Sequence, residues 1–517
     1  MIIPASPRSS NPAFGHPGSS ETIAQLTDDL VGFVRQSVRD GSRFDDVERG
    51  LFQRLLHIGG VAADLFLQAQ GDGDLGPTVR TAEGVDLHRS PAVQKRDVRS
   101  IFKEHTFDSF VYSRGAKQRI DLRPIDARVG LPRRKESFLF QEFSQLFCVE
   151  KAFAVGARQF ERIFGQRISV AVLEDINRDM GEQADRFLDE ELATPAAPDE
   201  GELLVLTADA KGVPLVRADA RRVPAFDAKE RPGNRRMATL GCAYTVDRWW
   251  RTPEDVVASL FRDAAATPPP HGRPEPCGKR YRGYFAYQPA GEEPIPGAIR
   301  TGTWLADEAA KRHRIGQPII CLMDGQPILW EAAEVCLDDF LQDRREAGEA
   351  VRVVDILDIL HVSSYVWQAA KVFHTHKEHQ EAFARDRLLR ILRGEVAGVV
   401  KGLRRLASSN GLDGSRSEVI ATVCNYFENN ATRMRYDEYL AAGYPIATGV
   451  IEGACRHVIK DRMEQGGMRW TLAGAEAMLN VRAVGASSES EAFQAWRRTE
   501  GWNAIIRIGI SRRSINH

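Results

Sequence analysis

The sequence predicts an α/β protein in which a mixed, largely parallel sheet is interrupted by an all-α insertion and preceded by a mainly helical region with a small β module. Three observations lead to this prediction. Apolar runs typical of buried strands alternate with helical patterns over residues 200–362. Residues 363–443 follow the helical period almost throughout. Upstream, residues 21–97 are mainly helical in pattern, whereas residues 98–136 alternate as strands do.

The N-terminal elements follow from periodicity and turn signals. Residues 1–20 lack the pattern of any element and predict a disordered tail. Helical spacing of apolar residues predicts two helices, in LTDDLVGFVRQSVRD and VERGLFQRLLHIGGVAADLFLQAQ. β-forming residues around a turn at Arg114–Gly115 predict that residues 98–136 form a small, basic hairpin module.

Residues 137–193 return to a helical pattern. Two helices, in KAFAVGARQFERIFG and ISVAVLEDINRDMGEQADRFL, are joined by a short connection, and Ser169 is a good N-cap for the second. This is the outline of a helix-turn-helix, whose second helix enters the major groove of DNA. An ordinary helical hairpin fits the same pattern, and the acidic second helix counts against its whole length lying in a groove. The mainly helical N-terminal region is therefore a candidate DNA-binding region.

The α/β core is predicted from residue 200 onward, after a linker at 194–202. Residues 267–298, rich in Pro and Gly, predict an irregular excursion. After the helical block, residues 444–485 return to the core with a strong helix, and residues 486–517 predict a basic tail. The predicted strands and helices between are, in order, LLVLTADAKGVPLVRA, RMATLGCAYTV, PEDVVASLFRDAA, RTGTWLADEAAKRHRI, QPIICLMDG, ILWEAAEVCLDDFLQDRREAG and VRVVDILDILHV.

Composition narrows the class of protein. No uninterrupted apolar stretch approaches about 18 residues, and the N-terminus lacks the apolar region of a signal peptide, so neither a membrane span nor secretion is expected. Seven scattered cysteines without a CxxC pair disfavour a zinc ribbon and indicate a reducing interior. We therefore expect a cytoplasmic protein.

Charge is balanced overall but unevenly distributed. The net charge is −1, yet residues 89–135 hold 13 Lys and Arg against 5 Asp and Glu. The stretch from Ala454 to the end holds 10 against 6. Such patches can follow the phosphates of a nucleic acid, although a solvated surface has the same composition.

Three acidic residues stand at the ends of predicted elements. Asp209 follows an apolar run and begins a predicted turn, Asp324 closes another run, and Glu452 lies in the first turns of a helix after Thr448, its predicted N-cap. Each alone fits an ordinary turn or helix-start role, and Glu452 can also pair with Arg456 at i+4. Together, two strand-borne aspartates and a helix-borne glutamate suit two-metal phosphoryl transfer, because Mg²⁺ prefers carboxylate oxygens. The order of elements is that of the RNase H-like fold.

Several segments resemble the DDE transposases of bacterial insertion sequences, in particular the ISKra-type family. The segments are TADAKGVPL, LMDGQPILWEAA, DILHVSSYVWQAA, YSRGAKQRIDLRPIDARVGLP and, most specific, GYPIATGVIEGACRHVIKDRMEQGGMRW. The resemblance covers about residues 98–485 and implies an RNase H-like catalytic domain with a helical insertion before the glutamate. Ala210 departs from the glycine common in the wider family. The chain also lacks the cysteine-rich ribbon of many relatives, so recognition of DNA ends must rest elsewhere.

The resemblance implies roles for the acidic residues. Asp209, Asp324 and Glu452 would be the catalytic metal ligands for Mg²⁺, with Mn²⁺ as a substitute. Asp358 and His361 form an Asp-x-x-His pattern that resembles a signature of Mutator-like transposases downstream of their second catalytic aspartate. That relation gives both a supporting role, while Asp358 stays open as the second ligand and His361 as an ordinary core histidine.

The expected substrate is double-stranded DNA, comprising the terminal inverted repeats of a transposon and a target. A homodimer or larger assembly is expected because two DNA ends have to be brought together, and the protein would act at the bacterial nucleoid. Two alternatives stay open: an RNase H-like nuclease that cleaves without joining, and a non-catalytic DNA-binding protein. Basic residues are expected to hold the DNA backbone, with the first two on the face of the helix that carries the glutamate: Arg456, Lys460, Arg462, Arg469, Lys117, Arg119, Arg133 and Arg134.

Overall fold

The computed structural model of the protein is a mixed α/β structure with a mixed sheet, as predicted. The chain folds into two compact units, one comprising residues 1–176 and 491–517 and the other residues 177–490. The predicted tail at 1–20 lies outside the described residues except for Ser20. The described ranges are 20–81, 83–115, 118–191, 200–224, 233–263 and 272–506.

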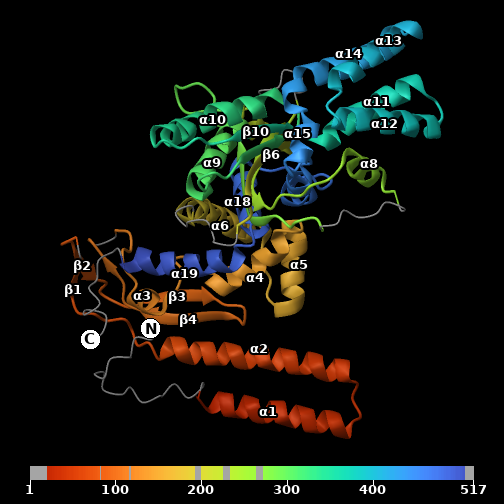
Figure 1. Cartoon of the computed structure of the whole chain (residues 1–517). Coiled ribbons are helices and arrows are strands. Elements are labelled where there is room, and N and C mark those ends of the chain that lie inside the picture. The colour runs from red at the N-terminus through yellow and green to blue at the C-terminus, as the bar shows by residue number, and fades with distance from the viewer. Residues whose placement is uncertain are drawn as a thin grey trace. The chain divides into compact units, whose positions relative to one another are not determined.

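The first unit begins with the two predicted helices and continues into short strands (Figure 1). β1, β2 and β5 form one small antiparallel sheet, and β3 and β4 form a hairpin. The predicted boundary between a helical region and the β module, at residues 97/98, is wrong, because strands already begin at Thr78. These first strands are short and carry charged residues at alternate positions, so they lack the apolar run that would have marked them as strands. The elements are α1 (Ser20–Arg39), α2 (Phe44–Gln68), β1 (Thr78–Arg80), β2 (Asp86–Arg89), β3 (Gln94–Arg99), β4 (Glu104–Ser109), β5 (Tyr112–Ser113) and α3 (Pro124–Val129).

A buried ion pair ties this β module together. Arg96 of β3 lies 3.0 Å from a carboxylate oxygen of Asp126 in α3. The same guanidinium donates to the carbonyls of Pro132 and Arg134 at 2.7 and 3.1 Å. At least one arginine of the basic stretch therefore has a structural role and is not available to a partner.

The predicted helical segment after the β module is present. It contains α4 (Phe138–Cys148), α5 (Phe153–Phe164) and α6 (Val170–Glu191). α5 ends at Gly165, which has a φ of 68° that only glycine adopts readily. The Ser169 hydroxyl accepts a hydrogen bond from the Val172 amide at 3.3 Å, which confirms the predicted N-cap. The predicted linker at 194–202 lies mostly outside the described residues.

The second unit is built on a five-stranded sheet of order β10-β9-β6-β7-β8. β6 pairs antiparallel with β7 and β7 with β8, whereas β6, β9 and β10 are parallel. β8 falls within the stretch predicted as irregular, since pairing with β7 overrides the local Pro and Gly signals. The strands are β6 (Leu203–Pro214), β7 (Arg235–Val246), β8 (Cys277–Phe285), β9 (Ile319–Met323) and β10 (Val353–Leu357).

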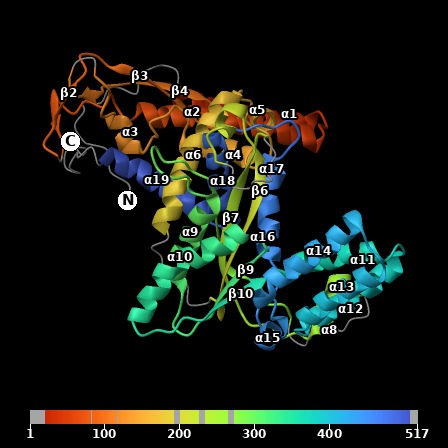
Figure 2. The same ribbon diagram turned by 90° about the horizontal axis from the view of Figure 1, so that it is seen from above.

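Helices pack on both faces of this sheet. A Cβ added to Gly241 of β7 would meet Thr301 of α9 (Gly297–Arg312) at 2.6 Å. On the opposite face, a Cβ at Gly283 of β8 would meet Leu479 of α18 (Leu472–Ala486) at 2.7 Å. Figure 2 shows α9 and the later helix α16 (Gly449–Ala454) on opposite sides of β6. These glycines allow helices to approach the strands closely.

The predicted all-α insertion is present, with a shifted start. The strand predicted to reach Val362 ends at Leu357, because the Asp358 carboxylate accepts a hydrogen bond from the Leu360 amide at 3.0 Å and caps the next helix. The connecting helices α7, α8 and α10 are Arg217–Ala220, Pro253–Phe261 and Pro327–Glu346. The insertion consists of α11 (Ile359–Phe373), α12 (Lys377–Leu392), α13 (Val396–Ser409), α14 (Gly414–Asn429) and α15 (Tyr436–Ala441).

The segment after α16 departs from regular α-helix. A π-helical turn, η2 (Cys455–Lys460), follows α16 directly and leads into α17 (Asp461–Met463). The predicted basic tail is wrong in its first part, where α19 (Ser490–Ile506) forms; residues 507–517 lie outside the described residues. Within the described ranges, no helix is both long and apolar enough to cross a membrane.

The close contact between α6 and α18 yields a stability prediction. A Cβ on Gly181 would collide with the backbone of Ala477, and backbone cannot move aside as a flexible side chain can. We expect Gly181→Ala to lower the free energy of unfolding by about 1–3 kcal/mol, measured by urea denaturation. Gly402, in α13, is the matched control, because a Cβ there meets nothing within 4 Å. Gly402→Ala should stabilise by up to roughly 1 kcal/mol, and equal effects of the two changes would contradict the packing argument.

Candidate active site

Three aspartates lie at one level of the central sheet, on adjacent parallel strands. In the pairing of β6 with β9, Leu206 lies opposite Cys321. Asp209 follows Leu206 by as many residues as Asp324 follows Cys321. Asp358 follows the last paired residue of β10 just as Asp324 follows that of β9. Continuing this register therefore places Asp209, Asp324 and Asp358 side by side.

Asp209 points to the face of the sheet that the glutamate-bearing helix covers. Asp209 lies opposite Leu240, and Leu240 opposite Gly283, which faces α18; cross-strand partners share a face. On the same side, the Cys455 thiol donates a hydrogen bond to the Asp209 carbonyl at 3.7 Å. Asp209 does not begin a turn as predicted, because β6 continues past it to Pro214 in register with β7.

The Asp209 carboxylate is buried and forms an ion pair with a lysine of the same strand. The Lys211 ammonium lies 2.8 Å from Oδ2, and the Ala210 amide donates to Oδ1 at 2.7 Å. Burial lowers the pKa of Lys211, but the hydrogen bond and the charge of Asp209 outweigh it, so the net pKa is raised. The Asp324 charge acts in the same direction. Lys211 is thus firmly protonated beside two carboxylates.

Asp324 is buried and oriented by the residues that follow it. The Gln326 amide donates to Oδ1 at 3.0 Å and its side chain donates to Oδ2 at 2.8 Å. The Trp330 indole donates to the Asp324 carbonyl at 2.7 Å. Burial raises the pKa of this carboxyl, the Gln326 bonds and the charge of His361 oppose the rise, and the Asp209 charge adds to it. A buried carboxylate beside another is a costly arrangement that favours a bound cation.

Asp358 has the environment of a structural brace. It has no exposed surface, and its carboxylate accepts hydrogen bonds from the Leu360 amide, the Thr448 amide at 3.2 Å and the Thr448 hydroxyl at 2.7 Å. Thr448 is the N-cap residue of α16, as predicted, but its hydroxyl makes no capping hydrogen bond because it is turned toward Asp358. Burial raises the pKa of Asp358, and these hydrogen bonds oppose the rise. One side chain thus joins β10, α11 and the start of α16.

Glu452 faces His361. Their Oε1 and Nε2 atoms lie 3.8 Å apart, and both side chains are partly exposed. Burial raises the pKa of Glu452, the charges of Asp358 and Asp209 raise it further, and those of His361 and Lys211 lower it. The predicted pairing with Arg456 is absent, because Arg456 lies 3.7 Å from Asp461.

The predicted metal ligands are brought to one region but not into one tight cluster. Over the described ranges, the group of three side chains whose ligand atoms all lie within 4.8 Å of one another is Asp358, His361 and Glu452. Asp209 and Asp324 stand outside that group, although the charge of Asp209 raises the pKa of both Asp324 and Glu452.

The helical insertion packs against the residue that follows Asp324, a contact that the sequence did not predict. A Cβ on Gly325, the residue after Asp324, would collide with the Tyr426 ring of α14. Tyr426 stacks on Tyr365 of α11 with ring centroids 3.8 Å apart. Burial raises the pKa of Tyr426, and the charges of Tyr365, Asp324 and Asp358 add to the rise. No local signal links α14 to Asp324, whereas Lys211 was detectable because side chains two apart on a strand share a face.

The basic residues predicted on and after the glutamate helix divide into two groups. Arg456, Lys460 and Arg469 are exposed. Arg462 has no exposed surface, and its guanidinium lies 4.7 Å from the centroid of the Trp470 ring, so it cannot reach DNA in this conformation. The π-helical turn also rotates Arg456 and Lys460 away from the positions that an α-helix would give them relative to Glu452.

The basic residues predicted in the β module also differ. Arg119 and Arg133 are exposed at a cavity of about 300 Å³ in the first unit. Arg134 pairs with Glu136 at 3.0 Å and so has a structural partner. Lys117 lies outside the described residues.

In comparisons with known proteins, no protein-family model and no curated protein matches this chain.

The brace at Asp358 yields a second prediction. Thr448→Val removes the hydroxyl that donates at 2.7 Å and leaves a buried carboxylate with fewer donors, so we expect a loss of about 1–3 kcal/mol in urea denaturation. Thr422→Val is the control, because that exposed hydroxyl donates only to the Glu418 carbonyl within α14. Its effect should stay within about 0.5 kcal/mol. If Thr448→Val lowered the free energy of unfolding as little as Thr422→Val, the structural role of the Asp358–Thr448 contact would be contradicted.

The raised pKa of Asp324 yields a third prediction. A carboxyl whose pKa is higher in the folded state stabilises the fold below its unfolded pKa, about 3.9, and loses that contribution as pH rises through the folded pKa. Asp324→Asn should therefore melt at or above the wild-type temperature at pH 7–8 in EDTA. The difference should shrink as the pH falls toward 4. A variant that melts well below the wild type at neutral pH would contradict the assignment of Asp324 as a strained, functional charge.

Proposed function

We propose that this protein is a DDE transposase with an RNase H-like catalytic domain, which cleaves DNA at transposon ends and joins the 3′ ends to target DNA. One observation carries the proposal: continuing the parallel register of β6 and β9 brings Asp209, within β6, beside Asp324, which directly follows β9, on the face that the Glu452 helix covers. The strand order β10-β9-β6-β7-β8, with β7 antiparallel to its neighbours, also agrees with the fold that the element order predicted. The resemblance described above supplies the reaction.

The side chains suit hard divalent ions. Asp209, Asp324 and Glu452 offer carboxylate oxygens, the ligands that Mg²⁺ and Mn²⁺ prefer. The ion pair between Asp209 and Lys211 at 2.8 Å supports this, because an Asp209 oxygen already accepts a cation at this position. Two bound ions would stabilise the attacking and leaving oxygens of a phosphoryl transfer.

The neighbouring side chains have positioning roles in this scheme. Gln326 fixes the rotamer of Asp324 from two directions, and Asp358 with Thr448 fixes the start of α16 and hence Glu452. His361 stands beside Glu452, partly exposed, where a protonated imidazole would contact a phosphate oxygen. Double-stranded DNA is the expected partner, and synapsis of two ends would need at least a homodimer.

Asp358 is the alternative second ligand. Its membership of the cluster with His361 and Glu452 favours this assignment. Its three hydrogen bonds from the protein oppose it, because they occupy the lone pairs that an ion would need. The assignment to Asp324 is therefore the proposal.

The fourth prediction tests the chemistry. Purified protein is incubated with Mg²⁺ or Mn²⁺, oligonucleotides that copy the DNA flanking the gene, and a target plasmid; cleavage and joined products are measured separately. Asp209→Asn, Asp324→Asn and Glu452→Gln should each reduce both by roughly a hundredfold or more, since a metal site supplies several kcal/mol of transition-state stabilisation. DNA binding, measured by fluorescence anisotropy, should persist.

The control for these variants is Asp355→Asn. Asp355 lies on β10, and its side chain points to the opposite face of the sheet from that of Asp358. The Asp355→Asn protein should therefore retain activity. Cleavage without joining would favour the nuclease alternative. A wild-type protein that binds DNA, but neither cleaves nor joins it, would favour the DNA-binding alternative.

A further inference from the structure

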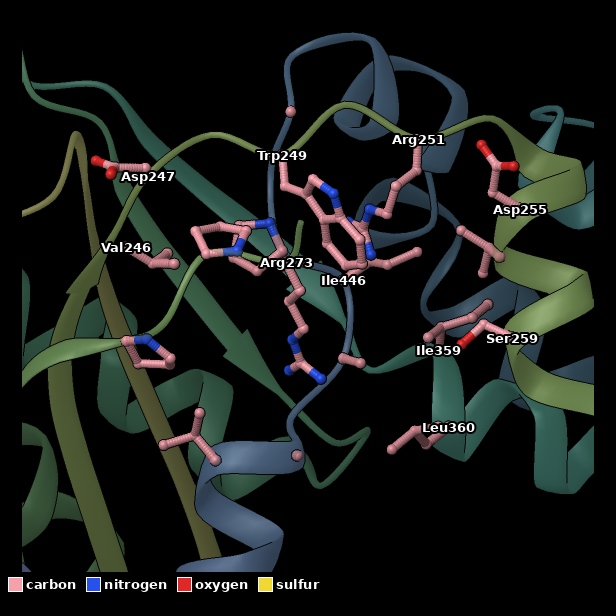
Figure 3. A pocket seen from close by; sticks show the side chains of 18 of the residues that line it. Val246, Asp247, Trp249, Arg251, Asp255, Ser259, Arg273, Ile359, Leu360 and Ile446 are labelled. Atoms are coloured by element: carbon pink, nitrogen blue, oxygen red, sulfur yellow. The ribbon is translucent and has the colours of Figure 1, made fainter. Parts of the chain in front are cut away.

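A second cavity lies in the unit that carries the carboxylates, away from their cluster. It has a volume of about 370 Å³ and is bordered by the segment after β7, the first turn of α11 and the segment that leads into α16. Figure 3 shows the side chains of Trp249, Arg251 and Arg273 grouped at this cavity, with Ile359, Leu360 and Ile446 along its apolar side. The volume is in the range of small-ligand sites.

The aromatic and basic wall is held rigidly. The Trp249 amide donates to the Gly443 carbonyl at 2.8 Å, and the Arg251 guanidinium donates to the Tyr444 carbonyl at 2.9 Å. The Arg251 guanidinium lies 4.4 Å from the centroid of the Trp249 ring. The backbone of the segment that leads into α16 therefore positions both side chains.

The charged residues that line the cavity balance in number, with Arg251 and Arg273 against Asp247 and Asp255, but the arginines are not paired with the aspartates. Burial and the positive charge of Arg273 lower the pKa of Arg251 to about 10, and the Asp255 charge opposes them. Across the described ranges, Nε of Arg251 has no hydrogen-bond partner and neither arginine has a carboxylate at ion-pair distance. Asp255 instead accepts from the Thr252 amide at 2.8 Å. Asp247 likewise accepts from the Glu202 amide at 3.2 Å. Two guanidinium groups that form no ion pair with a carboxylate can bind an anion, and phosphate in particular.

The cavity adjoins the candidate active site through two elements. Leu360 lines the cavity and precedes His361, and Val450 lines it two positions before Glu452. At 3.6 residues per turn, side chains two apart point to nearly opposite sides of a helix. The cavity and Glu452 therefore lie on opposite sides of the first turn of α16, roughly 10 Å apart, which a DNA strand spans in about three nucleotides.

We propose that this cavity receives one unstacked nucleotide of the DNA strand being processed, with its base against Trp249 and its phosphate between Arg251 and Arg273. The flat indole and the apolar side suit a base, and the arginines suit a phosphate. The inference rests on the proposed function, because it takes DNA as the substrate. It adds a site that holds the strand at a fixed distance from the carboxylates.

The test is photocross-linking in Ca²⁺, in which DNA binding proceeds without turnover. The probe is a set of branched duplexes from the gene's flanking DNA, each with 5-iododeoxyuridine at one position of the frayed strand, and cross-linked peptides are identified by mass spectrometry. We expect a cross-link to the peptide that contains Trp249, confined to one or two probe positions. Trp249→Ala should remove it and weaken binding of the branched duplex roughly 5- to 150-fold, the range that one stacked base contributes.

Two further variants keep the test sharp. Trp250, adjacent and 57% exposed but outside the cavity, is the matched control, and Trp250→Ala should leave the cross-link unchanged. Arg273→Gln, at an exposed position, should weaken duplex binding without affecting the fold. Cross-links elsewhere only, or equal effects of the two tryptophan changes, overturn the proposal.

The outcomes also separate this inference from the proposed function. Cleavage and joining without a Trp249 cross-link would overturn the cavity assignment alone. A Trp249 cross-link in a protein without cleavage would retain the nucleotide site and overturn the transposase. A third outcome is that free dAMP binds, that Trp249→Ala abolishes this binding, and that no DNA probe cross-links. The cavity would then bind a free nucleotide, and the proposal that it receives a nucleotide of a DNA strand would be wrong.

Discussion

The buried contact between Asp358 and Thr448 is the constraint on which the candidate site depends. Asp358 ends β10 and starts α11, and its hydrogen bonds to Thr448 bring in the segment that becomes α16. The helical insertion leaves the core at one side of this contact and returns at the other, so the contact closes a long excursion of the chain. Glu452 can face strand-borne carboxylates only because this junction fixes where α16 begins.

The carboxylates around this junction repel one another, and a neighbouring lysine offsets part of this repulsion. Lys211 neutralises Asp209 from the same strand, and His361 stands beside Glu452. Asp324 accepts hydrogen bonds from Gln326, and the charge of His361 also favours its ionised form, yet burial still raises its pKa. A carboxyl with a raised pKa of this kind lowers the stability of the fold, which is why such groups are candidates for functional sites.

The sequence predicted the alternation of strands and helices and the all-α insertion, because long amphipathic patterns are strong local signals. It did not predict β8, which forms through pairing with β7, or the end of β10, which the cap at Asp358 determines. At the candidate site the order of elements placed Asp209 and Asp324 together, since parallel strand register is a property of topology. The burial of Arg462 and the contact of Tyr426 with Gly325 depend on tertiary packing, which no local pattern contains.

The π-helical turn that begins at Cys455 has a consequence for how this helix can vary. A π turn arises when one extra residue enters an α-helix, and it shifts everything downstream by about 100° while everything upstream keeps its orientation. Here the part before the turn carries Glu452, and the turn itself carries Arg456 and Lys460. A single insertion or deletion at this turn would re-aim the basic side chains and leave the glutamate in place, so the two halves of the helix are free to diverge independently.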